Sequence, residues 1–258
     1  MDLVLLGVGF AIGIFSGIIS GAFGISASSI KIVLLRVLLG VGGAVAIATA
    51  LPLGIPAAVS GTLVYQKHRL LKYKTIITCG ITGALFSVAG AFATQYVPDA
   101  LLMLLLGFVL LAFAYLTYTS NGHGSEKRSC KQTLREKAGY TMLIGAVAGF
   151  ASGFLGIGGG VVVVPLLARL RKITYKQAIP CSLAIMLFYV VPASIAHLTL
   201  GHLDFELFGA LLAGSVLGAF AGAKLVVKTK EGDIKKWFAG LLAGFGGMLI
   251  FHEINSAN

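Results

Sequence analysis

The chain has 258 residues, of which 57% are hydrophobic and only 11% carry a charge, and its mean hydropathy is +0.95. Because a soluble domain carries about 25% charged residues, this composition excludes an ordinary soluble globular protein. The net charge of +11 would suggest a nucleic-acid partner for a soluble protein. Here the basic residues fall mostly in short loops, as the positive-inside rule describes for membrane proteins. We therefore predict an all-α polytopic membrane protein that contacts the lipid bilayer and no nucleic acid.

Apolar runs fill most of the sequence, and most of them are of the length that a helix needs to cross a bilayer. In the first half they cover 3–19, 30–39, 44–65, 75–94 and 100–118. No basic segment precedes the first run, so we expect a retained helix rather than a cleaved signal peptide. The run 44–65 contains Pro52 and Pro56 and is expected to be kinked. Three scattered cysteines indicate neither a disulfide framework nor a metal site, and no cofactor is expected.

Two stretches rich in glycine and serine, 20–29 and 152–160, interrupt the apolar pattern. Five glycines between positions 153 and 160 should break a helix, because glycine is a poor helix former. Inside a membrane, broken backbone is tolerated only where it is buried in protein or lines a cavity. The helix that follows such a break begins with exposed N–H groups, which attract anions. The alternative is that small residues simply let two helices approach closely.

The second half repeats the first at a constant shift in numbering, which places Ser20-Gly21 on Ser152-Gly153, Gly24 on Gly156 and Gly90 on Gly222. We therefore predict a first transmembrane repeat at 1–118, a cytoplasmic linker at 119–137 and a second transmembrane repeat at 138–258. A repeat of this size is typical of transporters built from two related halves.

Equivalent loops of the two halves carry opposite charge. The loop 67–74 is strongly basic and its counterpart 199–206 has no Lys or Arg, whereas the uncharged turn 40–43 corresponds to the basic loop 169–176. Under the positive-inside rule the halves are inverted. This predicts two inverted repeats of about five helical elements each, with the broken helices near the midplane, both termini outside, and a place in the cell membrane. Eight conventional spans with parallel repeats are the alternative.

Cations within the apolar runs point to an anionic substrate. Lys31, Arg36 and Lys224 lie in these runs, whereas all nine carboxylates fall in loops, at termini or at helix ends. A charge in lipid needs a partner, and a substrate anion could provide it. Arg36 and Lys224 could instead extend to an interface, and His197 is more readily explained as a packed histidine than as a proton relay.

The predicted substrate-binding residues come from both breaks and the helix start that follows the first one. They are Ser20, Gly21, Gly24, Ser26, Ser28, Ser29, Lys31, Ser152, Gly153, Gly156, Gly158, Gly159 and Gly160, with Arg36 and His197 as secondary candidates. Serine hydroxyls and bare glycine N–H groups are donors that suit a small oxyanion.

The sequence contains neither a Walker motif nor a nucleophile with a triad arrangement. We therefore expect a secondary transporter and no enzyme, with alternating access by rocking of the two halves about the breaks. An anion channel of the same architecture is the alternative. The small-residue motifs at Gly80, Gly83, Gly214, Gly218 and Gly222 indicate helix packing or, alternatively, a homodimer seam.

The motif Ser152-Gly153-x-x-Gly156-x-Gly158-Gly159-Gly160, followed by Pro165, Ala178, Ser182-Leu183 and Gly201-x-Leu203-Asp204, resembles the TauE/SafE family. This is the family of sulfite and organosulfonate exporters, also called the 4-toluene sulfonate uptake permease family. The resemblance covers almost the whole chain and implies transport of small anions that are often sulfur-containing, among them sulfite, sulfoacetate, related sulfonates and thiosulfate; a non-sulfur organic anion is the alternative. The first copy departs from the pattern, because Val33 stands where Pro165 suggests a proline.

Overall fold

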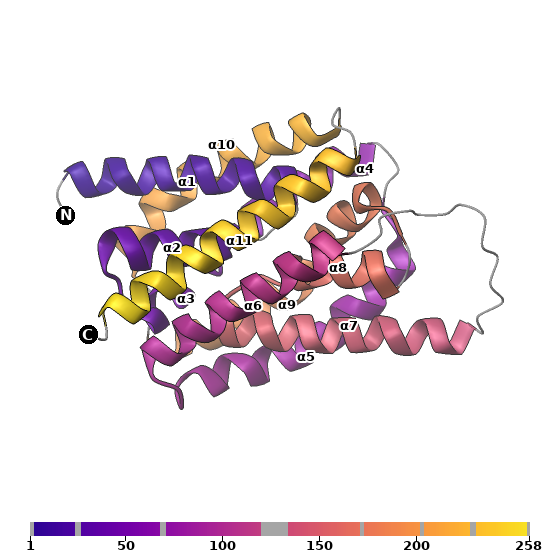
Figure 1. Cartoon of the computed structure of the whole chain (residues 1–258), viewed down its shortest axis with the longest axis horizontal. Coiled ribbons are helices and arrows are strands. Elements are labelled where there is room, and N and C mark those ends of the chain that lie inside the picture. The colour runs from indigo at the N-terminus through magenta and orange to yellow at the C-terminus, as the bar shows by residue number, and fades with distance from the viewer. Residues whose placement is uncertain are drawn as a thin grey trace.

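The described residues of the computed structural model are 3–23, 27–67, 71–119, 134–170, 173–201, 204–227 and 231–256. They form eleven helices (Figure 1): α1 (Leu3–Phe23), α2 (Ala27–Leu39), α3 (Gly43–Ala50), α4 (Gly54–Lys67), α5 (Tyr73–Thr94), α6 (Asp99–Thr119), α7 (Leu134–Leu155), α8 (Gly160–Leu170), α9 (Tyr175–Thr199), α10 (Phe205–Val227) and α11 (Glu231–Ser256). The described part of the chain contains no strand, which confirms the all-α prediction. Helix α7 begins before residue 138, so the expected linker 119–137 is helical at both edges.

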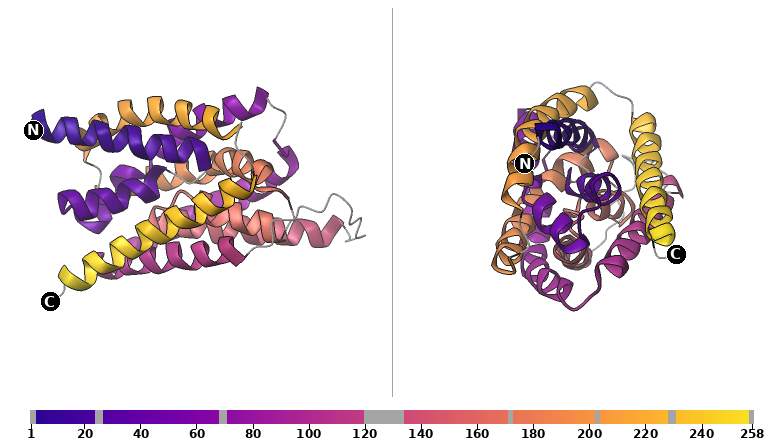
Figure 2. Two further views of the ribbon diagram at one scale, coloured as in Figure 1. Left: turned by 45° about the horizontal axis from the view of Figure 1, so that its top comes forward. Right: turned by 90° about the vertical axis from the view of Figure 1, so that its left-hand side faces the viewer.

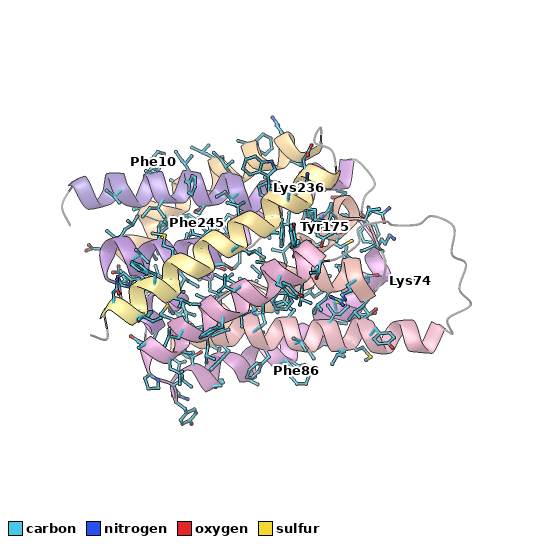
Figure 3. The ribbon with its side chains drawn as sticks, viewed as in Figure 1. Phe10, Lys74, Phe86, Tyr175, Lys236 and Phe245 are labelled. Carbon is cyan, nitrogen blue, oxygen red and sulfur yellow. The ribbon has the colours of Figure 1, made fainter. Side chains whose placement is uncertain are left out.

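Six helical segments in the described part are long and apolar enough to cross a bilayer: Gly43–Gln66, Tyr73–Thr94, Asp99–Thr119, Gln177–Thr199, Phe205–Gly222 and Lys235–Asn255. Shorter apolar stretches lie in α1, α7 and α8. Large apolar side chains cover the outside of the bundle, as they do on a surface that faces lipid; among them Phe10 and Phe86 project outward in Figure 3. The protein is therefore a multi-pass membrane protein.

The first half contains one more helix than expected, because the run 44–65 is interrupted. Helix α3 ends at Ala50 and α4 begins at Gly54. Pro52 lies in this interruption, where a ring nitrogen without a hydrogen cannot continue the helical hydrogen bonds. Pro56 lies in the first turn of α4, a position at which a missing N–H costs little. The corresponding helix of the second half, α9, is continuous although it contains two prolines.

The first helix of each half packs against a helix of the other half, and we call these two contacts the exchanged pairs. Helix α1 lies along α10, and α7 lies along α5. An added Cβ on Gly17 of α1 would come within 2.6 Å of the carbonyl oxygen of Ser215, and one on Gly149 of α7 would overlap the carbonyl oxygen of Gly83. The repeat relates the first contact to the second, because Gly17 corresponds to Gly149 and Gly83 to Ser215. These backbones touch directly because the glycines have no side chains between them.

The predicted packing role of the small-residue motifs is confirmed within the chain. Added Cβ atoms at Gly214, Gly218 and Gly222 would meet the backbone of α1. Gly80 and Gly83 face Phe188 and Tyr189 of α9. These small-residue faces are therefore covered by other helices of the same chain.

The view along the bundle in Figure 2 shows α11 on the side opposite to α1 and α10. Helix α11 packs instead on α6, its own counterpart in the first half. The buried core is formed mainly by α2, α3, α8 and α9, which carry most of the fully buried side chains. The helices that follow the two glycine-rich stretches, α2 and α8, therefore lie in the interior.

Candidate functional site

The second glycine-rich break is present as predicted. Helix α7 ends at Leu155 and α8 begins at Gly160, and every residue between them is buried. Gly156, Gly158 and Gly159 have φ angles of +67°, +57° and +70°. These values lie in the left-handed region that only glycine visits readily. The sequence needs glycine at these positions because a side chain would strain the turn.

The start of α8 presents backbone donors. The Val163 N–H donates to the Gly159 carbonyl at 2.7 Å, and the Gly160 N–H donates to the Gly158 carbonyl at 3.0 Å. Among the described residues, no acceptor pairs with the N–H groups of Gly158, Gly159 or Val161. Unpaired N–H groups at a helix start are the usual donors for an anion. The start of α8 therefore has N–H donors without an acceptor in the described part of the chain, and the substrate-binding role of the glycines at 158–160 stays a prediction.

Tyr189 supports this turn and was not identified from the sequence. Its hydroxyl donates to the Gly158 carbonyl at 3.1 Å, and its side chain is fully buried. An added Cβ on Gly159 would overlap the same hydroxyl. The signal in the sequence was a hydroxyl-bearing aromatic residue within an apolar stretch of α9. The equivalent position in the first half is Ala57.

The first break is described only at its two edges. Helix α1 is described up to Phe23 and α2 from Ala27, and residues 24–26 between them lie outside the described residues, so the first break stays a prediction. The predicted site residues Gly24 and Ser26 lie outside the described residues. Ser20, Ser28 and Ser29 are buried to 1% exposure or less. Ser152 at the end of α7 is equally buried, and its Oγ has no hydrogen-bond partner among the described residues.

Helix α2 packs directly on the second break. The Ser29 hydroxyl donates to the Ile157 carbonyl at 2.9 Å. An added Cβ on Gly156 would come within 2.7 Å of Ile32 and 2.9 Å of Ile47. The structure thus brings Ser29 of the first break together with Gly156 and Ile157 of the second, as the repeat predicts.

Lys31 has the most unusual surroundings of the predicted site residues. Its side chain is 0% exposed, and its Nζ has no hydrogen-bond partner among the described residues. The ion pair between Arg36 and Glu253 does not include Lys31. Lys31 follows Ser28 by three positions, so both lie on one face of α2, a different face from Ser29. A buried ammonium needs an anionic partner, which makes Lys31 the strongest candidate for anion binding.

The ends of α1 and α7 are held by equivalent contacts. The Tyr65 hydroxyl donates to the Gly21 carbonyl at 3.2 Å, and His197 Nε2 lies 2.9 Å from the Gly153 carbonyl. Because a carbonyl only accepts, Nε2 carries the proton in this contact. The repeat that places Ser20 on Ser152 also places Tyr65 on His197 and Gly21 on Gly153. His197 is therefore a packed histidine that anchors a site residue, and Tyr65 performs the same task in the first half.

The expectation that Arg36 lacks a carboxylate partner is wrong. Its Nη2 donates to Glu253 Oε2 at 3.0 Å and its Nε donates to Oε1. The Glu253 side chain is only 2% exposed. Helix α11 continues to Ser256 and brings this carboxylate against the last turn of α2. Lys224, in contrast, is exposed and lies 4.2 Å from the centre of the Phe220 ring, as expected for a surface lysine.

Known proteins similar to this chain are described as probable membrane transporters. Residues 9–249 match the family model described as sulfite exporter TauE/SafE. The probable membrane transporter protein MJ0441 of Methanocaldococcus jannaschii is 29% identical over 203 residues, which cover 76% of this chain and 74% of that protein. The probable membrane transporter protein YunE of Bacillus subtilis is 27% identical over 225 residues, 82% of each chain. No solved structure matches. Since the family model extends from α1 to the last turns of α11, this chain belongs to the TauE/SafE family.

Proposed function

We propose that this protein is a secondary transporter of small anions, with sulfur oxyanions and organosulfonates such as sulfite as its substrate class, in the cell membrane. The observation that carries the proposal is Lys31, a fully buried ammonium on α2 without a partner among the described residues. Burial of a charge in a membrane protein is costly and is retained where the charge serves a substrate or an ion.

The neighbouring donors suit an oxyanion. Ser28 lies one turn before Lys31, and the Oγ of Ser152 is buried without a partner in the described part of the chain. The start of α8 adds N–H groups without an acceptor among the described residues, and Ile157, just before it, accepts from the Ser29 hydroxyl. A cation, hydroxyl groups and N–H groups are together the donors that suit an anion with several oxygens.

Alternating access is supported by the course of the helices. In Figure 1, α1 starts at the left-hand end of the molecule and its counterpart α7 starts at the right-hand end. Lys74 lies at that same right-hand end in Figure 3. Opposite directions of equivalent helices favour the inverted repeat, in which two related arrangements of one bundle open to opposite sides.

The contacts of α1 with α10 and of α7 with α5 indicate which helices move together. Because α1 touches α10 backbone to backbone, and α7 touches α5 in the same way, each pair is expected to move as one body. Rocking of residues 1–118 against 138–258 would separate both pairs. We therefore propose that access alternates by motion between the exchanged pairs and the core helices.

Counterflow of labelled sulfite into proteoliposomes loaded with unlabelled sulfite tests the function, with lactate-loaded vesicles as the comparison. A carrier accumulates label only in the sulfite-loaded vesicles. Lys31→Gln is expected to abolish accumulation, and Lys224→Gln, which removes an exposed lysine, is the matched control. Equal leakage into both kinds of vesicle would indicate a channel and contradict the carrier. Absence of flux for sulfite and for a panel of sulfonates would contradict the substrate class.

A further inference from the structure

Few charged side chains are buried in the described part of the chain. Glu253 is the buried carboxylate in the described part of the chain, and Arg36 is paired with it. The exposed basic residues there include Lys72, Lys74, Arg169, Lys224 and Lys236. Among the described residues, Lys31 is therefore the fully buried Lys or Arg whose charge no carboxylate balances.

The pairing of Arg36 restricts what it can offer to a ligand. Two of its nitrogens are engaged by the two oxygens of Glu253, and Nη1 donates to the Val41 carbonyl at 3.3 Å. A guanidinium used in this way has no net charge left for a second anion. Although Arg36 lies on the same helix as Lys31, it does not raise the charge of the site.

We infer that the anion site carries one positive charge, supplied by Lys31, and that this residue selects singly charged anions over doubly charged anions of the same shape. The inference rests on the proposed function and adds the charge of the substrate to it. One ammonium balances one negative charge. A second negative charge would remain unbalanced in the bundle interior, where an unpaired charge is expensive.

Methanesulfonate and thiosulfate are the probes that separate charge from shape. Each consists of an SO₃ group with one further heavy atom. In methanesulfonate this atom is a methyl carbon and the anion carries one negative charge, whereas in thiosulfate it is a sulfur and the anion carries two. Hydroxyl and N–H donors meet the same oxygens in both. The cost of one unbalanced charge on the mildest membrane scale corresponds to about a 100-fold difference in affinity.

The experiment is a titration of the purified protein in detergent with each sodium salt at constant ionic strength, read as the rise in its unfolding midpoint. Methanesulfonate should stabilise the wild-type protein at concentrations about 100-fold below those of thiosulfate. Lys31→Arg keeps the charge and should keep the preference. Lys31→Gln should lose it, while Lys224→Gln should behave as the wild type.

Each outcome decides the inference. If thiosulfate stabilises the protein at the same or lower concentration, selection by charge is wrong, while anion transport stands. A preference that survives in Lys31→Gln would show that another group supplies it. If neither anion stabilises the protein and no sulfonate shows counterflow, the proposed function fails and the inference fails with it. Lys31→Arg keeps the test valid if Lys31→Gln does not fold.

Discussion

Arg36 and Glu253 are separated by 217 positions in the sequence and form a double hydrogen-bonded ion pair between the last turns of α2 and α11. The Glu253 side chain is 2% exposed and that of Arg36 is 18% exposed. The pair joins a core helix beside the first break to the C-terminal helix of the other half. It also explains how an arginine can lie in an apolar part of the chain without contacting substrate.

Replacement of Glu253 by Gln should destabilise the protein, because it leaves the Arg36 charge without a counter-charge. Removal of one partner of a buried pair costs about 3–5 kcal/mol, and the partial exposure of Arg36 places the expected loss at about 3 kcal/mol or below. Thermal unfolding in detergent measures the change. Glu206→Gln, at an exposed carboxylate of α10, is the control. An unchanged unfolding midpoint in Glu253→Gln would show that the pair contributes no stability.

Replacement of Gly149 by Ala should disrupt the contact of α7 with α5. The added Cβ would overlap the backbone of Gly83, and such overpacking costs about 1–3 kcal/mol or more. Gly244→Ala on α11 is the matched control, because its Cβ would meet no atom within 4 Å. There the change should stabilise the helix by up to about 1 kcal/mol. Equal unfolding midpoints for the two variants would contradict the close packing.

Gly159 and Tyr189 should behave as a coupled pair. Gly159→Ala is expected to impair folding and transport, because φ of +70° strains an alanine and its Cβ would overlap the Tyr189 hydroxyl. Tyr189→Phe removes one hydrogen bond to the Gly158 carbonyl and should cost about 1–3 kcal/mol. The double variant should lose less than the sum of the two, since the overlap is partly relieved. A double-mutant cycle of unfolding free energies measures the coupling, and strict additivity would refute it.

A disulfide between α1 and α10 should leave transport intact. An ideal Cβ on Gly9 lies 3.1 Å from the Cβ of Ala210, close to the separation of about 3.8 Å in disulfides. The pair Gly9→Cys and Ala210→Cys, in a chain whose native cysteines are replaced, tests the exchanged packing by counterflow before and after reduction. Each single-cysteine variant is a control. Arrest of transport that reductant reverses would instead support rocking of the two sequence halves.

Local properties of the sequence were sufficient for the class of protein and for the position of the second break. The hydropathy of each apolar run is the sum of its residues and does not depend on the fold. Positive φ angles at Gly156, Gly158 and Gly159 need glycine whatever surrounds them. The internal repeat of the sequence corresponds to matching contacts in the structure, Tyr65 with Gly21 and His197 with Gly153. Lys31 was identified because a cation in an apolar run is visible in the sequence itself.

The partners of these residues depended on how distant helices pack, which local propensity does not determine. Glu253 was assigned to a terminal segment, whereas α11 brings it against Arg36. Tyr189 was not identified from the sequence, because only the packing of α9 brings its hydroxyl to the turn at Gly158. The sequence determined by itself that the chain is a membrane bundle with a glycine-rich break at 156–159, because these features follow from solvation and backbone freedom residue by residue. Only the tertiary structure decided that Arg36 is neutralised and that Lys31 is not, because that depends on which helix ends meet.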